Sequence, residues 1–336
     1  MFRVGELPAM ATLRERFLGS ILGCAVGDAL GAPFEGSSSS AVRSRWGRHV
    51  RFHPIPGYPL GQYTDDTQLT LAMMRSICRM QRVDGADIAN EFIRLWQTDE
   101  IVGAGASCTD AVYAMMDNGK SWEEAGTAEG RAGNGSAMRA APVGLWNYAH
   151  PELIEQDAVT SSIITHRDSR SIAGAIAVAK AVQLCVNADR LDPPAFIEEV
   201  SHAVRKTSEP FARWISQLSQ LLGTGPSEAL PHIYGAGNPD FGPRQPGWIT
   251  AYVVPTVLGA LYFFLRTPHD FIESITEAIG AGGDTDTIGA ITGAISGAFN
   301  GTSSVPAALI ADLKDSSNII ALTEQFYRVA ASRQPR

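Results

Sequence analysis

Glycine recurs at every fourth position in two stretches that lie far apart in this 336-residue chain. The first stretch holds Gly19, Gly23, Gly27 and Gly31, and the second holds Gly289, Gly293 and Gly297. This spacing places each set along one face of a helix, where the absence of Cβ atoms lets a second helix come close. A glycine inside a helix costs about 1 kcal/mol relative to alanine. The pattern therefore predicts two buried helices that must pack closely.

The glycine spacing is also found in membrane helices, which this sequence disfavours. Two interpretations within a folded core stay open. Helix dimers in membranes use the same spacing, but Asp28, Asp284 and Asp286 interrupt or border the two apolar stretches, which disfavours a lipid environment. The glycines either serve the tight packing of two core helices alone, or they also bring polar groups from distant parts of the chain together.

Helical periodicity extends over most of the chain. Apolar residues follow Asp66 at helical spacing, and Thr64 is in the position of an N-cap for that helix. The same spacing recurs in residues 11–30, 87–97, 171–186, 193–206, 212–222, 251–265, 270–280 and 318–332, whereas alternating strand-like runs are nearly absent. The sequence predicts an all-α fold in a single domain over residues 1–336, with loops at 54–61 and 235–247 and flexible ends at 1–10 and 332–336.

Charge and composition exclude several classes of protein. A hydrophobic content of 45% with 18% charged residues is typical of a folded globular protein rather than a disordered chain. The net charge of −8 and the lack of a Lys/Arg run disfavour nucleic-acid binding. Four cysteines without CxxC spacing indicate reduced thiols. Because neither a leader nor a membrane helix is expected, the predicted location is cytoplasmic.

Two clusters of oxygen-bearing side chains border the glycine helices. One is Thr64, Asp65 and Asp66, and the other is Asp284, Asp286 and Thr287. Carboxylates at helix starts often serve only as caps, which is the alternative interpretation of these residues. However, unpaired carboxylates beside buried helices are costly, and bound cations would offset that cost. Oxygen ligands without a nearby His or Cys pair favour Mg²⁺, Mn²⁺ or Ca²⁺ over zinc, and the two clusters could share two ions.

Three further segments carry residues suited to binding or catalysis. The motif GDALGAPFEG places Asp28 at the end of the first glycine helix and Glu35 in the following loop, where Glu35 could gate a site or act as an acid or base. The glycine-rich segments at 102–112 and 132–139 can present backbone N–H groups to a ligand, and the second also carries Asn134 and Ser136. His166 precedes a small-residue helix, where a lone histidine is more often a cap or core residue than a catalyst.

Taken in order, five motifs make this chain similar to the ADP-ribosylglycohydrolase family. The motifs lie between about Arg14 and Gly301 and are GDALGAPFEG, YTDDTQ, GNGSAMRAAPVGL, TH before a small-residue helix, and GGDTDTIGAITGAISGA. The family includes the dinitrogenase-reductase-activating glycohydrolases and the eukaryotic ADP-ribosylhydrolases. The resemblance implies an orthogonal all-α domain with two Mg²⁺ or Mn²⁺ ions. It also implies cleavage of the bond between C1″ of ADP-ribose and an acceptor.

The resemblance assigns roles to individual residues. It implies metal ligation by Thr64, Asp65, Asp66, Asp284, Asp286 and Thr287, with Asp286 as the bridge between the ions. It implies that Glu35 closes over the site, and the predicted catalytic residues are Asp65, Asp66, Glu35 and Asp286. The predicted substrate contacts are Gly103 and Gly105 near the diphosphate, Gly133, Asn134 and Gly135 around the distal ribose, and Ser136 and His166 as further substrate-binding residues.

Two departures from the family pattern concern the substrate and the general base. Relatives often carry an aromatic residue before GN that stacks on adenine, where this chain has Arg131 and Ala132. An arginine face, or an aromatic residue near Tyr252 and Trp248, is expected to take that role. Some members have an acidic residue in the segment that here reads IVGAG at 101–105. The identity of the general base therefore stays open.

The expected activity is the removal of ADP-ribose from a modified protein side chain. ADP-ribosyl-arginine is the expected linkage, since bacterial members with YTDDTQ and GGDTDTIG include many arginine-directed enzymes. A mouth bordered by Asp28, Glu35 and the metal carboxylates would also attract a cationic guanidinium. The expected partners are an ADP-ribosylated protein and released ADP-ribose, in regulation or in immunity against a toxin. Alternatives are hydrolysis of ADP-ribosyl-serine or O-acetyl-ADP-ribose, and a non-enzymatic ADP-ribose binder.

Overall fold

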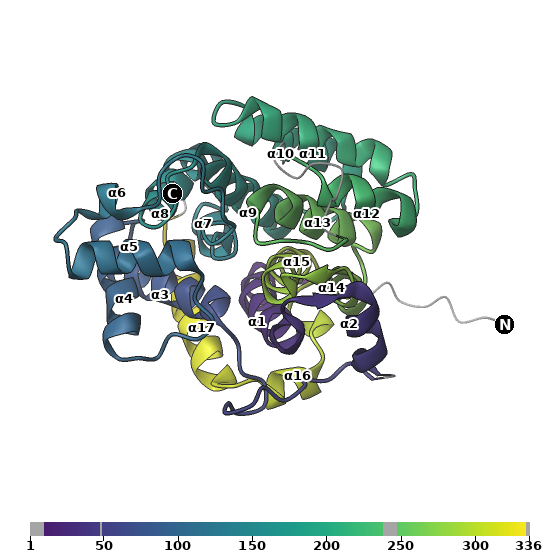
Figure 1. Ribbon diagram of the computed structural model, residues 1–336, viewed down its shortest axis with the longest axis horizontal. Helices are drawn as coiled ribbons and strands as arrows, with labels where there is room; N and C mark the ends of the chain where they lie inside the picture. Colours follow the sequence, from purple (N-terminus) through teal and green to yellow (C-terminus); the bar gives the residue numbers. More distant parts are fainter. Residues whose placement is uncertain (1–9, 48, 238–246, 334–336) are drawn as a thin grey trace.

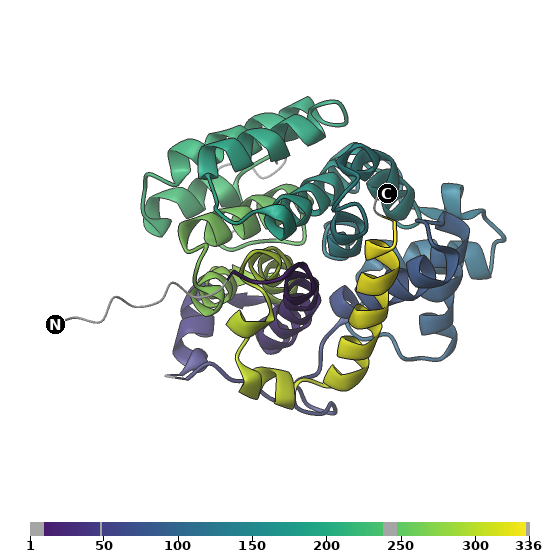
Figure 2. The same ribbon diagram turned by 180° about the vertical axis from the view of Figure 1, so that it is seen from behind.

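The computed structural model describes residues 10–47, 49–237 and 247–333, whose regular secondary structure is almost entirely helical (Figure 1, Figure 2). The earlier helices are α1 (Leu13–Gly31), α2 (Ser39–Trp46), α3 (Asp65–Met80), α4 (Gly85–Gln97), α5 (Ala106–Met116), α6 (Trp122–Ala125), α7 (Ala141–Trp146), α8 (Ile154–Ile163) and α9 (Ser169–Asn187). The later helices are α10 (Pro193–Arg205), α11 (Glu209–Leu221), α12 (Pro226–Tyr234), α13 (Val253–Arg266), α14 (Phe271–Gly280), α15 (Thr285–Asn300), α16 (Ala307–Asp312) and α17 (Ser316–Ala331). Short 3-10 turns are η1 (Ala32–Phe34), η2 (Pro151–Leu153) and η3 (Thr302–Ser304). The predicted all-α fold is confirmed.

Helices α1 and α15 lie antiparallel at the centre of the molecule and are both almost wholly buried (Figure 1). The residues that face each other along their contact are Gly19 with Gly297, Gly23 with Gly293, Gly27 with Gly289, and Gly31 with Thr285. A Cβ atom on Gly27 would lie 2.0 Å from the carbonyl oxygen of Gly289, so a side chain there would push the two backbones apart. The predicted close packing of the two glycine helices is confirmed.

The other helices pack around this central pair. Helices α9, α13 and α14 contact α15, while α3 and α17 contact α1. In Figure 1, helices α4 to α6 lie at one side of the molecule and α10 to α12 at another. Figure 2 shows α17 crossing the back of the molecule beside α1 and α3. The starts of α3 and α15, which carry the two acidic clusters, therefore lie near the middle of the fold.

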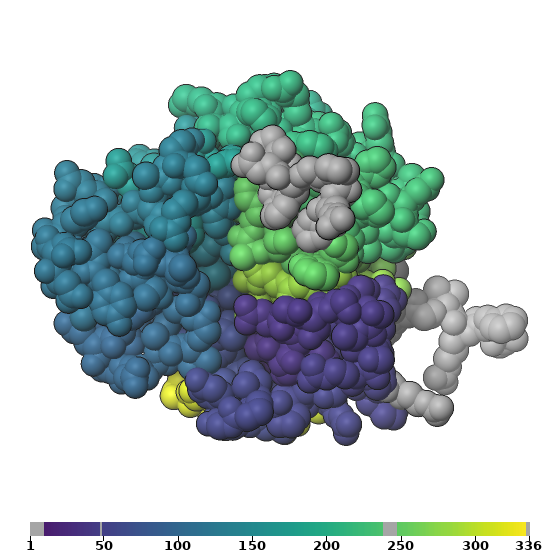
Figure 3. All heavy atoms as spheres, viewed as in Figure 1, coloured from purple at the N-terminus to yellow at the C-terminus, as the bar shows by residue number. Residues whose placement is uncertain are grey.

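A short antiparallel sheet ties the loop after α1 to the segment before α15. Strand β1 (Ser37–Ser38) pairs with β2 (Gly282–Gly283), and the N–H of Gly36 donates to the carbonyl of Gly283 at 2.8 Å. The N–H of Asp284 donates to the carbonyl of Ile249 at 2.9 Å. In the space-filling view the purple N-terminal segment accordingly abuts the green segment from late in the chain (Figure 3). These bonds hold Glu35 and Asp284 in one region.

Some of the predicted loops and ends are only partly described. Residues 54–61 form a loop, as predicted. Most of the predicted loop at 235–247, and all but Met10 and residues 332–333 of the predicted flexible ends, lie outside the described residues. Arg333 donates to the carbonyl of Trp146 at 2.8 Å, and its guanidinium lies 3.9 Å from the centre of the Trp146 ring.

The long apolar helices of this fold are core helices. The segments Leu13–Phe34 and Ser169–Asn187 have the length and composition of a membrane-spanning helix. They are however 89% and 72% buried inside the molecule, which is the environment of central helices in a helical protein. The four cysteines are also buried, and each is a free thiol.

Candidate active site

A cavity of about 180 Å³ lies where the starts of α3, α5 and α15 meet the loop after α1. The predicted site residues that line it are Glu35, Asp65, Asp66, Gly103, Gly105, Gly133, Asn134, Gly135, His166, Asp284, Asp286 and Thr287. Thr64 and Ser136 are buried but do not line this cavity. The structure thus gathers both acidic clusters and both glycine-rich segments into one pocket.

The two acidic clusters meet at Asp66, in the first turn of α3. Its Oδ2 atom accepts a hydrogen bond from the hydroxyl of Thr287 at 3.4 Å and lies 3.3 Å from the hydroxyl of Thr64, which shares its one proton with the closer carboxylate of Asp28. Its Oδ1 atom is buried and has no hydrogen-bond partner among the described residues. A buried carboxylate oxygen without a partner is costly, so this atom is well placed to ligate a cation.

Burial and mutual repulsion raise the pKa values of the site carboxylates. The pKa of Asp65 rises to about 8, because the side chain is buried and lies near Asp28 and Asp284. The pKa values of Asp66 and Asp286 are also well above the usual range, because of burial and then of neighbouring carboxylates. The ion pairs formed within the described part of the chain involve none of these five carboxylates. The pocket therefore crowds carboxyl groups whose ionised forms no cation among the described residues balances, so without a bound cation they tend to keep their protons.

The chemistry of these donors fits a hard divalent cation. All the predicted ligands offer oxygen, either from a carboxylate or from a hydroxyl, and oxygen is the donor that Mg²⁺ and Mn²⁺ prefer. Within the described residues, no three His, Cys, Asp or Glu side chains converge into a ready-made ligand shell. Rotation of the carboxylates about their side-chain torsions would therefore accompany ion binding.

Asp28 of α1 holds the start of α3 in place through hydrogen bonds. It is fully buried in α1 and accepts hydrogen bonds from the N–H and hydroxyl of Thr64, both at 2.9 Å, and from the N–H and hydroxyl of Thr67, at 3.0 and 2.6 Å. Burial raises the pKa of Asp28 to about 6, against the effect of these bonds. The expectation that Asp28 borders the mouth of the pocket is wrong, because α3 covers it. Thr64 is the N-cap residue of α3, as predicted, but its hydroxyl makes no capping bond.

Asn134 and Ser136 both contact protein groups. The Nδ2 atom of Asn134 donates to Oδ2 of Asp284 at 2.7 Å and to the hydroxyl of Thr256 at 3.0 Å, so Asn134 orients a predicted metal ligand. The hydroxyl of Ser136 donates to the carbonyl of Ser171 at 3.0 Å. The structure consequently places the Ser136 hydroxyl against α9 rather than in the pocket, because the turn that carries it packs on that helix.

Glu35 enters the pocket from the loop between η1 and β1. The residue is solvent-exposed and lines the cavity together with Asp284. Partial desolvation of its carboxylate, which faces the pocket, and then the nearby charge of Asp284 raise the pKa of Glu35. A carboxylate at the exposed edge of a pocket, with its pKa moved toward neutrality, is suited to proton transfer.

Helix α5 and two glycines form the part of the pocket suited to an anion. Helix α5 begins at Ala106 after the N-cap residue Gly105, and both residues line the cavity, so the first backbone N–H groups of the helix are available there. A Cβ atom would lie 2.9 Å from Nε2 of His166 if built on Gly133, and 2.7 Å from Cε1 if built on Gly135. The two glycines thus allow the imidazole of His166 to lie against the backbone of this turn.

The residues expected to stack on adenine do not line this cavity. Arg131 forms an ion pair with Asp110 at 2.8 Å. The guanidinium of Arg170 lies 5.6 Å from the centre of the Tyr252 ring. Trp248 is an exposed side chain. An adenine ring stacked on any of these would lie beyond the wall of the 180 Å³ cavity.

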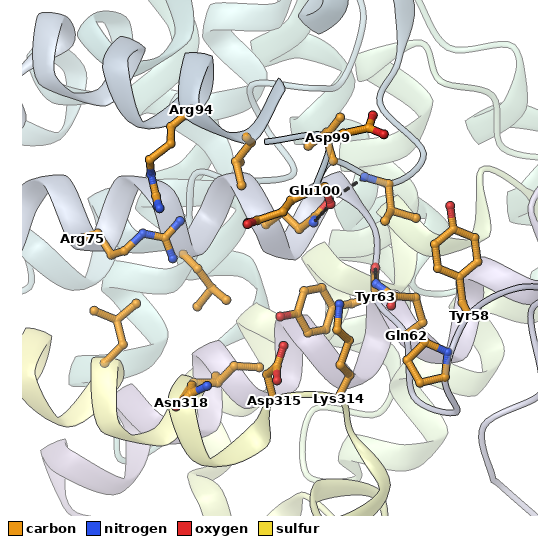
Figure 4. A pocket seen from close by; sticks show the side chains of 18 residues that line it. Tyr58, Gln62, Tyr63, Arg75, Arg94, Asp99, Glu100, Lys314, Asp315 and Asn318 are labelled. Atoms are coloured by element: carbon orange, nitrogen blue, oxygen red, sulfur yellow. Dashed lines mark hydrogen bonds between the residues drawn. The ribbon is translucent and has the colours of Figure 1, made fainter. Parts of the chain in front are cut away.

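A larger cavity, of about 720 Å³, lies beside residues 99–102 (Figure 4). It contains none of the predicted site residues, and its charged lining residues are Arg75, Arg94 and Lys314 against Asp99, Glu100 and Asp315. Asp65 donates its N–H to the carbonyl of Val102 at 2.8 Å, and Val102 donates its own N–H to the Gln68 side chain at 2.8 Å. The segment that borders this larger cavity is thus fastened to the start of α3. The acidic clusters, and not cavity size, identify the candidate site.

Comparison with known proteins gives consistent matches over nearly the whole chain. A sequence profile described as ADP-ribosylglycohydrolase matches residues 9–336. An uncharacterized protein of Archaeoglobus fulgidus is 32% identical over 94% of this chain and 97% of its own length. The ADP-ribosyl-[dinitrogen reductase] glycohydrolase of Rhodospirillum rubrum is 29% identical over 90% of this chain and 91% of its own length. Human ADP-ribosylhydrolase ARH3 is 28% identical over 87% of each chain.

A solved structure shows the same fold. A chain of an ADP-ribosylglycohydrolase-related protein complex matches with a TM-score of 0.72 and 25% identity, covering 95% of this chain and 99% of that chain. The family resemblance expected from the five sequence motifs is therefore confirmed by the full-length profile and by this fold. The chain belongs to the ADP-ribosylglycohydrolase family of hydrolases.

Proposed function

We propose that this enzyme removes ADP-ribose from a modified arginine side chain of a protein, and that two Mg²⁺ or Mn²⁺ ions take part in the reaction. The observation that carries the proposal is the meeting of both acidic clusters at Asp66, inside a pocket that the N-terminus of α5 also lines. Such a pocket joins a place suited to cations with a place suited to an anionic diphosphate.

Six residues would hold the ions, namely Thr64, Asp65, Asp66, Asp284, Asp286 and Thr287. Bound divalent ions would neutralise the buried negative charge, act as Lewis acids toward the substrate and lower the pKa of a water molecule. The unpartnered Oδ1 atom of Asp66 supports this assignment. Asp28 would fix the position of Thr64, and Asn134 that of Asp284, since groups that hydrogen-bond to metal ligands orient them.

The carboxylates of the chain would supply proton transfer and charge stabilisation. Positive charge develops at C1″ as the glycosidic bond breaks, and the carboxylates of Asp65 and Asp286 would stabilise it. Glu35 is suited to accept a proton from the attacking water, because its raised pKa and exposed position match that role, and Asp65 or Asp66 is the alternative base. The N–H groups at the start of α5 would bind the diphosphate without added positive charge, in keeping with a net charge of −8.

Electrostatics favours the arginine linkage. A guanidinium leaving group is cationic, and Glu35 at the exposed edge of the pocket would attract it, while the net charge of −8 disfavours acidic acceptors. The name of the Rhodospirillum rubrum relative specifies an ADP-ribosylated protein as its substrate, which favours a protein-linked substrate for this enzyme. Bound ions would cancel part of the carboxylate charge, so ADP-ribosyl-serine and O-acetyl-ADP-ribose stay as alternative substrates.

The deciding experiment incubates the purified protein with arginine-, serine- and acetyl-linked ADP-ribose and measures free ADP-ribose, with Mg²⁺ and after chelation. The expected result is fastest release from the arginine linkage, lost on chelation and restored by Mg²⁺. The variant Asp66→Asn serves as a control for contaminating hydrolases and should release none. Faster metal-dependent release from another linkage would overturn the arginine assignment but keep the enzyme. No release from any substrate would instead favour a non-enzymatic ADP-ribose binder.

A further inference from the structure

His166 presents one ring nitrogen to the protein and the other to the pocket. The side chain is 2% exposed and lines the candidate active site. Its Nδ1 atom lies 2.8 Å from the hydroxyl of Thr165. Its Nε2 atom, next to Gly133, has no hydrogen-bond partner among the described residues. A ring nitrogen that a buried side chain presents to a pocket is suited to a ligand, provided that its protonation state is defined.

Arg139 contacts the same hydroxyl of Thr165. Its guanidinium is fully buried and donates to the hydroxyl of Thr165 at 2.7 Å, to the carbonyl of Gly135 at 2.6 Å and to the carbonyl of Ser161 at 3.1 Å. It also lies 4.8 Å from the centre of the Phe92 ring. No carboxylate of the described residues lies within ion-pair distance of this guanidinium. Its hydrogen-bond partners are therefore neutral groups, including the two carbonyls and the Thr165 hydroxyl.

These contacts define the direction of the hydrogen bond to His166. A guanidinium can only donate, so the Thr165 hydroxyl is an acceptor toward Arg139. The hydroxyl is fully buried, and its own proton needs an acceptor. The Nδ1 atom of His166 is at hydrogen-bond distance, whereas the thiol of Cys108, the other group nearby, is neutral and a weak acceptor, because burial raises its pKa to about 11. Nδ1 therefore accepts, and the ring proton resides on Nε2.

We propose that Arg139 and Thr165 are positioning residues that hold His166 as the neutral imidazole protonated at Nε2, so that Nε2–H donates to an anionic oxygen of the bound ligand. The identification of that oxygen with the diphosphate of ADP-ribose rests on the proposed function. Helix α5 begins in the same pocket, so its first N–H groups and Nε2–H would serve one anionic group together.

The surroundings of the imidazole keep it neutral. Burial, and then the positive charges of Arg139 and Arg131, outweigh the opposing charge of Asp168 and lower the pKa of His166 to about 3. Arg139 thus acts in two ways, because it orients the Thr165 hydroxyl and disfavours a second proton on the ring. Ligand binding through Nε2–H should consequently be independent of His166 titration between pH 5 and about 8, unlike binding through a histidine with its usual pKa near 6.5.

Nitrogen-15 NMR of the histidine side chains tests the proton arrangement without any activity measurement. The signals that disappear in His166→Asn identify His166. We expect the wild type to show a protonated Nε2 and an unprotonated Nδ1 from pH 5 to 8, and Thr165→Ser, which keeps the hydroxyl, to show the same. Thr165→Val should lose this arrangement and show a mixture of the two neutral tautomers. An imidazolium or a protonated Nδ1 in the wild type would overturn the proposal.

Calorimetric titration with ADP-ribose tests the consequence for binding. Thr165→Val should weaken ADP-ribose binding about tenfold, the effect of one misdirected hydrogen bond to a charged group, while Thr165→Ser binds like the wild type. In turnover assays the loss should fall on KM more than on kcat, because the contact is remote from the reacting carbon. Equal binding by all three proteins would overturn the role in ligand binding. If the NMR result holds but ADP-ribose does not bind, the proton arrangement is supported and the proposed function fails.

Discussion

The variant Gly27→Ala tests whether the glycine contact between α1 and α15 sets the geometry of the candidate site. A Cβ atom on Gly27 would lie 2.0 Å from the carbonyl oxygen and 2.5 Å from the carbonyl carbon of Gly289. Both atoms belong to the backbone of a buried helix, so no side-chain rotation can relieve the overlap. The two helices must move apart, and because Asp28 follows Gly27 and Asp286 lies in the first turn of α15, the two acidic clusters must move with them.

The size of the effect follows from opposing contributions. Overpacking of a well-packed core typically costs 1–3 kcal/mol, and a backbone-to-backbone overlap belongs at or above the top of that range. The higher helix propensity of alanine offsets about 1 kcal/mol of this loss of stability. The net loss of stability should thus be about 2 kcal/mol or more, which corresponds to a fall in Tm of about 3 °C or more for a chain of 336 residues. Displaced ligands should also lower Mn²⁺ affinity about 10- to 100-fold.

Thermal unfolding and calorimetric Mn²⁺ titration measure both effects. The matched control is Gly280→Ala, because Gly280 also lies within a helix, α14, and a Cβ atom there meets only Nη2 of Arg43, at 3.9 Å. The control should bind Mn²⁺ like the wild type and unfold at the same temperature or slightly above it, because alanine has the higher helix propensity. A lower Tm for Gly27→Ala with unchanged Mn²⁺ affinity would mean that the glycines serve core packing alone. Wild-type values for both quantities would refute the reasoning.

Three further predictions concern the candidate site. Asp286→Asn should abolish turnover and reduce the number of bound divalent ions measured by elemental analysis; wild-type rates would contradict the assignment of Asp286 as a ligand. Glu35→Gln should lower kcat more than substrate affinity, because a proton acceptor acts mainly in the transition state, whereas a rise in KM alone would make Glu35 a binding gate. The Tm of metal-free protein should fall as pH rises from about 4 to about 8. The reason is that the folded-state pKa of Asp65 is raised to about 8 from the usual 3.8, so the folded state binds this proton more tightly than the unfolded chain and loses that stabilisation as the proton leaves. Millimolar Mg²⁺ should remove most of this slope, and a flat profile without metal would contradict the crowding of carboxylates at Asp66.

The glycine contact and the acidic clusters could be predicted because their signals are local. A period of four is visible within one helix, and the facing of Gly27 and Gly289 needs only that two such helices meet. Likewise, two runs of oxygen-bearing residues at helix starts indicate cation binding without knowledge of the fold. That both runs converge on Asp66 follows from the antiparallel packing of α1 and α15, which places the starts of α3 and α15 together.

The partners of buried polar side chains could not be predicted in the same way. The sequence predicts Asp28 at the mouth of the pocket, yet it is buried, and its hydrogen-bond partners Thr64 and Thr67 lie 36 and 39 residues further along the chain. Asn134 donates to Asp284, 150 residues away. Arg139 is fully buried, although a lone arginine after a glycine-rich turn is usually exposed. Such pairs depend on tertiary packing, for which a single sequence carries no periodic signal.

The most direct test of the account is a crystal structure of the protein grown with Mn²⁺, measured for anomalous scattering by manganese. We predict two anomalous peaks in the 180 Å³ cavity, from two ions ligated by oxygen atoms of both acidic clusters. Asp66→Asn crystals grown in the same way should lose at least one of the two peaks. An empty cavity at millimolar Mn²⁺, or peaks bound only outside the two clusters, would contradict the claim that the glycine helices assemble a divalent metal site.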